Sequence, residues 1–101
     1  MQWEDKGEMI RLGNIMNQSA ENKKEFHDFC IKHMQKFDWQ AWDMFCNVIQ
    51  IIPEEMKKDI EFWKEAWPYL KLVVNGGKFT PTGAIRIALL QDVCQNYFKL
   101  D

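Results

Sequence analysis

Apolar positions recur along most of this chain at the three- and four-residue spacing of an amphipathic α-helix. The stripe is clearest between residues 23 and 37, where it closely follows the i, i+3, i+4, i+7 pattern. It consists of Phe26, Phe29, Cys30, His33, Met34 and Phe37. Asn22 and Glu25 form a plausible capping box at its start. An earlier helix is predicted over residues 4–17, although Gly7 and Gly13 weaken it.

The next helix, predicted over residues 39–52 after Asp38 as N-cap, is unusually apolar. Its polar side chains project onto a strip only about 80° wide. They are Gln40, Asp43, Asn47 and Gln50. A surface helix normally needs an apolar stripe of little more than about 100°, and this helix has roughly twice that width. Part of its apolar surface is therefore available for contacts beyond the core.

Residues 53–67 predict a helix that covers the core with one narrow stripe. Pro53 fits its first position. The stripe contains Met56, Ile60, Trp63 and Trp67, and Phe62 lies well off it. Charged residues fill the remaining positions, with acidic and basic side chains at helical spacing.

A break is predicted at Pro68, because the residue before a proline is biased away from helix. Residues 70–75 are ambiguous, since Asn75 and Gly76 could turn a hairpin. The return strand would be short and would contain Pro81, which strands disfavour. A short helix over residues 68–75, ended by glycine, is therefore preferred to a strand.

The last helix is predicted over residues 81–98, with Thr80 as cap and Pro81 at the first position. Its broad apolar face contains Ile85, Leu89, Leu90, Val93, Cys94, Tyr97 and Phe98. Arg86 points into that face. The whole pattern predicts an all-α, compact single-domain bundle of five to six helices over residues 1–101, with helices 39–52 and 81–98 at its centre.

Composition supports one globular domain and limits the possible partners and cellular locations. The chain has 101 residues, 47% of them hydrophobic and 28% charged, which is typical of a folded domain. A net charge of −2 argues against electrostatic capture of nucleic acid or of an acidic membrane. Neither a secretory signal nor an apolar run of about 18–20 residues is found. The three cysteines are widely spaced and odd in number, so a reducing, cytoplasmic location is expected.

Metal and thiol chemistry find little support in the sequence. His27, Cys30 and His33 are spaced by three residues, but the two histidines are about 240° apart on a helix and cannot converge on one ion. Cys46 and Cys94 lie among aliphatic residues, which raises a thiol pKa and makes it inert. No metal, cofactor or catalytic residue is therefore expected, and the chain is predicted not to be an enzyme.

Carboxylates on the helix after Pro53 leave a weaker enzymatic alternative. Small all-α nucleotide pyrophosphohydrolases bind magnesium through an E-E-x-x-E/D run followed by E-x-x-D. Here Glu54 and Glu55 lead to Lys58, and no E-x-x-D follows, so the departure falls on the metal ligands. A magnesium-dependent nucleotide hydrolase would have to use Glu54, Glu55 and Asp59.

Basic residues provide the second alternative, a nucleic-acid-associated accessory protein. Its candidate residues are Lys23, Lys24, Lys32, Lys36 and Arg86. Glu25 and Asp28 dilute the basic side of the helix, and the chain has no contiguous basic stripe. Nucleic acid is therefore an improbable partner.

The leading hypothesis is a small non-catalytic protein that acts by binding another protein, as an inhibitor, an adaptor or a small subunit of an assembly. A compact chain without motifs also suits a phage or mobile element. The candidate contact residues lie at the margins of the apolar stripes: Trp39, Met44, Ile51 and Phe62. A homodimer formed through helix 39–52 is the simplest version.

Overall fold

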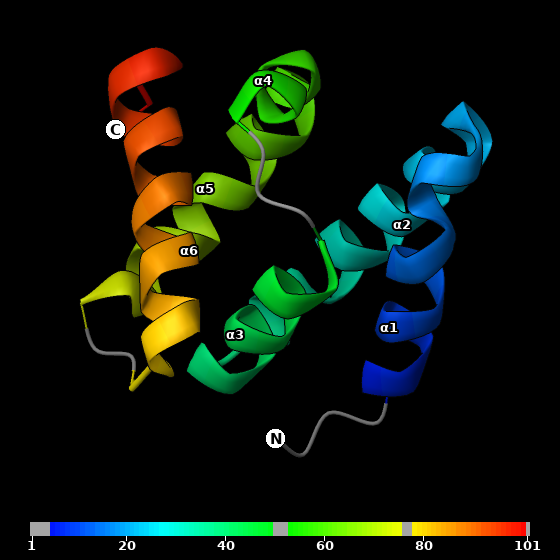
Figure 1. Ribbon diagram of the computed structural model, residues 1–101, viewed down its shortest axis with the longest axis horizontal. Helices are drawn as coiled ribbons and strands as arrows, with labels where there is room; N and C mark the ends of the chain where they lie inside the picture. The colour runs from blue at the N-terminus through cyan, green and yellow to red at the C-terminus, as the bar shows by residue number, and fades with distance from the viewer. Residues whose placement is uncertain (1–4, 50–52, 76–77, 101) are drawn as a thin grey trace.

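Helices make up nearly all of the structure, a computed structural model that describes residues 5–49, 53–75 and 78–100 (Figure 1). The longer helices are α1 (Lys6–Ile15), α2 (Ala20–His33), α3 (Trp39–Val48), α5 (Ile60–Val74) and α6 (Pro81–Asp92). Shorter helical segments are η1 (Met16–Gln18), η2 (Met34–Lys36), α4 (Pro53–Met56), η3 (Lys57–Asp59) and η4 (Val93–Tyr97). No strand occurs in the described residues, and the prediction of an all-α bundle is confirmed.

The central position of α3 organises the bundle (Figure 1). α1 and α2 pack together on one side of it, and α5 and α6 lie on the other side. α3 contacts α1, α5 and α6, so the prediction that this helix is central is confirmed. None of the helices in the described parts of the chain is both long enough and apolar enough to cross a membrane.

The start of α2 is set by Ser19 rather than by the predicted Asn22. Ser19 Oγ accepts a hydrogen bond from the Asn22 backbone N–H at 3.0 Å, which makes Ser19 the N-cap. Asn22 lies in the first turn, where its side-chain amide donates to the Ile15 carbonyl at 3.2 Å. The predicted capping box is therefore wrong, and the helix begins at Ala20.

Asp38 and Ile49 bound α3. Asp38 Oδ1 accepts a hydrogen bond from the Ala41 N–H at 2.8 Å, so the predicted N-cap is confirmed. Val48 is the last helical residue, and Ile49 is extended, with φ −92° and ψ 151°. The helix thus ends earlier than predicted, and residues 50–52 of the predicted helix lie outside the described part of the chain.

The buried stripe of α5 explains why the chain stays helical through Pro68. The predicted break at this proline is wrong, and so is the strand alternative, because α5 continues to Val74. A proline inside a helix costs about 3 kcal/mol. Burying a large apolar side chain contributes about 1.5–3 kcal/mol, and both Trp67 and Leu70, on either side of the proline, are buried. Tertiary packing therefore outweighs the local preference.

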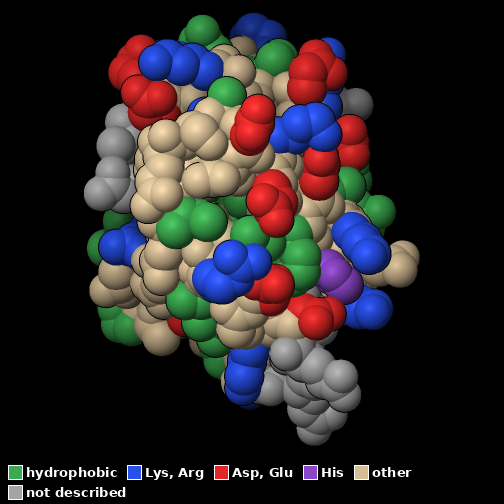
Figure 2. All heavy atoms as spheres, turned by 90° about the vertical axis from the view of Figure 1, so that its right-hand side faces the viewer, with side chains coloured by type: hydrophobic (Ala, Val, Ile, Leu, Met, Phe, Trp, Pro, Cys, Tyr) green, Lys and Arg blue, Asp and Glu red, His purple; other side chains and the backbone are tan. Residues whose placement is uncertain are grey.

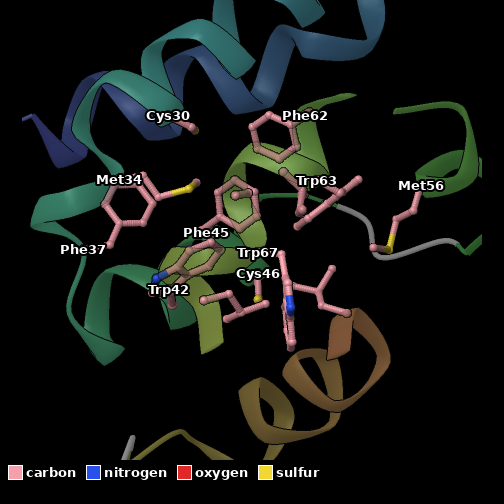
Figure 3. Close-up of a cluster of buried hydrophobic side chains, with 14 of the residues drawn as sticks. Cys30, Met34, Phe37, Trp42, Phe45, Cys46, Met56, Phe62, Trp63 and Trp67 are labelled. Atoms are coloured by element: carbon pink, nitrogen blue, oxygen red, sulfur yellow. The ribbon is translucent and has the colours of Figure 1, made fainter. Parts of the chain in front are cut away.

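Phe45 of α3 lies at the centre of the core (Figure 3). Its ring is 5.4 to 6.5 Å, centroid to centroid, from those of Phe26, Phe37, Trp42, Phe62 and Trp63. Trp42, Trp63 and Trp67 are almost fully buried, which confirms their prediction as core residues. α5 also buries Phe62, Ala66 and Leu70, so it presents a wider face to the core than the narrow stripe predicted for it.

Candidate functional site

Thr80, Pro81 and Gly83 position the start of α6 against α3. Thr80 Oγ1 accepts a hydrogen bond from the Gly83 N–H at 3.0 Å and donates to Asp43 Oδ1 at 3.1 Å. The predicted cap at Thr80 and the predicted proline at the first position are both confirmed. A Cβ atom at Gly83 would lie 1.6 Å from Asp43 Oδ1, so any other residue here would force the Asp43 carboxylate to move.

Arg86 connects the middle of α6 to the end of α3 through hydrogen bonds. Its Nη1 donates to the Cys46 carbonyl at 2.6 Å and to Asn47 Oδ1 at 3.2 Å. The carbonyls of a helix's last turn have no partner within the helix, and a cation there also opposes the negative end of the helix dipole. Arg86 is the one charged residue between Pro81 and Gln91, and it is turned toward the core side.

The outer face of α6 is consequently apolar or neutral over almost its whole length. It comprises Pro81, Thr82, Ala84, Ile85, Ala88, Leu89, Asp92, Gln95 and Asn96, all of which are exposed. Ile85 is 66% exposed and Leu89 is 40% exposed. Asp92 carries the one charge on this face. A surface helix normally presents charged and polar side chains to water, so this face is exceptional.

A hollow borders the outer face of α6 on each side. On the alanine side, a hollow of about 330 Å³ is lined by Val74, Lys78, Phe79, Ala84, Ile87, Ala88 and Gln91. On the Leu89 side, a hollow of about 260 Å³ is lined by Lys57, Leu89, Asp92, Val93, Asn96 and Tyr97. Lys57 Nζ lies 4.4 Å from the Tyr97 ring centroid, and this ring is 55% exposed. The outer face and its two hollows together form an uneven, largely apolar surface.

The sequence prediction placed Ile85, Leu89 and Tyr97 on the buried side of the last helix, and this is wrong. The buried side is formed by Gly83, Ile87, Leu90, Val93 and Cys94. At about 100° per residue, Ile85 and Leu89 project roughly opposite to this group. The helix is apolar on nearly every side. The sequence therefore did indicate an exposed apolar face, because the apolar arc of this helix is too wide to be buried on one side.

Of the four contact residues predicted from the sequence, the three that the structure describes are mostly covered. Phe62 is 7% exposed and stacks between His27 and Phe45, so its predicted exposure is wrong. Trp39 is half-buried and meets the Phe79 ring edge-on, and Met44 is half-buried against the core. Ile51 lies outside the described residues. Among the described residues of this set, a dimer through α3 would find little exposed apolar surface.

The five candidate basic residues do not form one surface. Lys23 Nζ pairs with Asp59 at 2.9 Å, and Lys24 Nζ pairs with Asp28 at 2.6 Å. Arg86 is held against α3, as described above. Lys32 and Lys36 are exposed. On the face that α1 and α2 form, acidic and basic side chains are intermixed (Figure 2).

A shallow groove of about 540 Å³ runs between α2 and α5. The ring of His27 stacks on Phe62 in its wall, with centroids 4.1 Å apart and planes 19° apart. Burial lowers the pKa of His27 below its usual value of 6.5; Asp59 opposes this shift, and Lys23 adds to it. Because the lining carries charges of both signs, the groove favours no ligand of a single charge.

The thiols considered for catalysis are buried, and the candidate carboxylates are paired with lysines. Cys30, Cys46 and Cys94 are buried, and burial raises the pKa of Cys46 and of Cys94 to about 12. The candidate carboxylates pair with different lysines: Glu54 with Lys57, Glu55 with Lys58 and Asp59 with Lys23. Within the described residues, no three His, Cys, Asp or Glu side chains are placed to hold a metal ion.

Comparisons of the chain with protein-family models, with curated protein sequences and with solved structures found no match. The function of the chain is therefore inferred from its own geometry.

Proposed function

We propose that this chain acts by binding a protein through the outer face of α6. The observation that supports this function is the exposure of Ile85 and Leu89 on a helix face whose one charge is Asp92. Large exposed apolar side chains on a neutral, uneven surface are typical of protein contact sites. The contact surface thus lies on α6, instead of at the margins of α3 that the sequence favoured.

The free energy gained by burying apolar side chains also favours α6 as the contact surface. Removing a large aliphatic side chain from water contributes about 1.5–3 kcal/mol when burial is complete. Ile85 and Leu89 retain a large part of this free energy, because both are still exposed in the monomer. The hollows on either side of the face offer space for side chains of a bound partner. Arg86, which would have to lose water in such a contact, is already hydrogen-bonded to α3.

A capture experiment with matched variants tests the proposal. Tagged wild-type chain, Ile85→Glu and Leu72→Glu would be exposed to an extract of the native host, and each captured protein would be quantified by mass spectrometry. Leu72 is 78% exposed on a different helix, α5, so its variant controls for the general effect of a new surface glutamate. We expect at least one protein of the extract to be captured by the wild-type chain and by Leu72→Glu but not by Ile85→Glu. The captured protein could also be the untagged form of this chain.

The variants must first be shown to be folded, by equal urea midpoints, since exposed substitutions usually change stability by no more than about 0.5 kcal/mol. Capture that is the same for Ile85→Glu and wild type, or the absence of any captured protein, would overturn the proposal.

A further inference from the structure

We infer that the groove between α2 and α5 binds an amphipathic helix of a partner protein, with acidic side chains along one edge of that helix and basic side chains along the other. The described residues that line this groove belong to α2, η3 and α5, so the surface is separate from the outer face of α6. The inference therefore goes beyond the proposed function and does not depend on it. It rests on how the charges of the groove are divided between its two walls.

The two walls of the groove carry opposite charges. Three lysines and one aspartate line the α2 wall, which gives it a net charge of +2; they are Lys23, Lys24, Lys32 and Asp28. The wall that η3 and α5 form is lined by three carboxylates, with a net charge of −3; they are Asp59, Glu61 and Glu65. Among the described lining residues, no lysine or arginine lies on this second wall. The groove as a whole is nearly neutral, but its charges are sorted by side.

The walls are joined at one end of the groove and remain separate at the other. Where the groove begins, Lys23 Nζ pairs with Asp59 Oδ2 across it at 2.9 Å. Further along the two helices, Lys32 and Glu65 are exposed, and neither forms an ion pair with a described residue. Opposite charges are thus available to a ligand on opposite sides of the same groove.

The two remaining charged residues of the walls are paired only within their own helices. Lys24 Nζ lies 2.6 Å from Asp28, and Glu61 Oε1 lies 3.8 Å from Lys64 Nζ. Exposed pairs of this kind contribute little free energy, so these side chains can turn toward a bound partner at little cost.

The floor between the charged walls is mostly apolar. It includes Ile31 of α2 and Phe62 of α5, and the ring of His27 stacks on Phe62 with the centroids 4.1 Å apart. Because burial lowers the pKa of His27, its ring is neutral near pH 7 and adds no charge to the floor. An apolar floor between two rims is the kind of surface on which the apolar stripe of an amphipathic helix docks.

The length of the groove and the lack of a sheet edge favour a helix over an extended peptide. The lining residues of α2 run from Ala20 to Lys32, a rise of about 18 Å. A partner helix of about 12–14 residues spans this length. No strand occurs in the described parts of the chain, so an extended peptide would find no sheet edge there to pair with. A helix needs no such edge, because it satisfies its own backbone hydrogen bonds.

The opposite charges of the walls also determine the direction of the partner helix. Its acidic edge lies against α2 and its basic edge against α5, because like charges facing each other across an interface are unfavourable. Turning the partner end for end, with its apolar stripe still on the floor, would exchange the two edges. Segregated charges therefore select one of the two directions along the groove.

Two synthetic peptides of identical composition test the inference. Both are stapled as helices and share one stripe of leucine and alanine. The first carries glutamates along one edge and lysines along the other, and the second carries both residue types on each edge. Each is titrated into the full chain, labelled with ¹⁵N, and binding is followed by NMR.

We expect the first peptide to bind about tenfold more tightly than the second, because several exposed ion pairs act together. Its binding should shift the amide signals of Ile31, Lys32, Phe62 and Glu65, and added salt should weaken it. Equal affinity of the two peptides, or no binding of the first at millimolar concentration, would overturn the inference.

Variants of the chain provide matched controls for the first peptide. Glu65→Lys should weaken its binding about fivefold, since a lysine then faces the basic edge. Glu25→Lys makes the same change at an exposed position of α2 outside the groove, so it should leave the affinity unchanged. Ile85→Glu, on α6, should also leave it unchanged. Binding that is insensitive to Glu65→Lys, or that is lost with Ile85→Glu, would show that the peptide does not occupy the groove.

Discussion

At the scale of single residues, glycine sets how closely two helices approach α3. A Cβ atom at Gly13 of α1 would lie 2.0 Å from Val48 Cγ1, and one at Gly83 of α6 would lie 1.6 Å from Asp43 Oδ1. At Gly7, also in α1, a Cβ atom would meet no atom within 4 Å. The sequence shows Gly7 and Gly13 as equal weaknesses of one helix. Only the packed structure separates a required glycine from a replaceable one.

The two glycines of α1 should respond to alanine with opposite signs. Gly13→Ala should lower the free energy of unfolding by about 1–3 kcal/mol, because the new methyl group overlaps the Val48 side chain and forces α1 from α3. Gly7→Ala should raise it by about 0.5 kcal/mol through the better helix propensity of alanine. Urea unfolding of both variants measures this difference. A stabilising Gly13→Ala would show that the two helices are not packed this closely.

At the scale of elements, α5 shows where local signals fail. Pro68 and the residue before it predict a break, and the chain passes through both as helix. Trp63, Trp67 and Leu70 lie on one buried side of α5, and Pro68 is exposed on the other. The caps at Asp38 and Thr80, by contrast, were predictable, because a cap depends on a few adjacent residues.

Pro68→Ala should stabilise the fold. Proline is about 3 kcal/mol less favourable than alanine in a helix interior, but it also restricts the unfolded chain, so a net gain of about 2 kcal/mol is expected. The position is exposed, and the substitution leaves the buried stripe of α5 unchanged. Thermal and urea unfolding provide the measurement. Destabilisation would mean that the proline sets a bend on which the packing of Trp67 and Leu70 depends.

At the scale of the whole molecule, folding brings residues that are distant in the sequence into contact around His27. This residue lies where α2 meets η3 and α5. Its ring stacks on Phe62, with Lys23 and Asp28 from α2 and Asp59 from η3 as the charged groups around it. Burial lowers the pKa of His27 in the native state. The unfolded chain takes up the proton at a pH of about 6.5, at which native His27 is still mostly neutral. Acid therefore favours unfolding through this residue.

The sign of this effect gives a pH prediction. Native stability should fall as the pH drops below about 6.5, and the loss from His27 should stop once the pH passes its lowered native pKa. His27→Phe keeps a ring against Phe62 but cannot titrate. Urea midpoints of wild type and variant, at pH values of about 7.5 and 5, isolate the effect from that of the carboxylates. An equal fall in both proteins would contradict a lowered pKa at His27.

The sequence by itself determined that this protein is a bundle of helices, where α3 and α6 begin, and that Trp42, Trp63 and Trp67 are core residues. These features depend on adjacent residues or on a clear helical period. Tertiary structure alone decided the continuity of α5, the burial of Phe62 and the exposure of Ile85 and Leu89. The period shows which residues share a side of a helix. When a helix is apolar all round, only its packed neighbours decide which side they cover, and the side left bare on α6 is the candidate site.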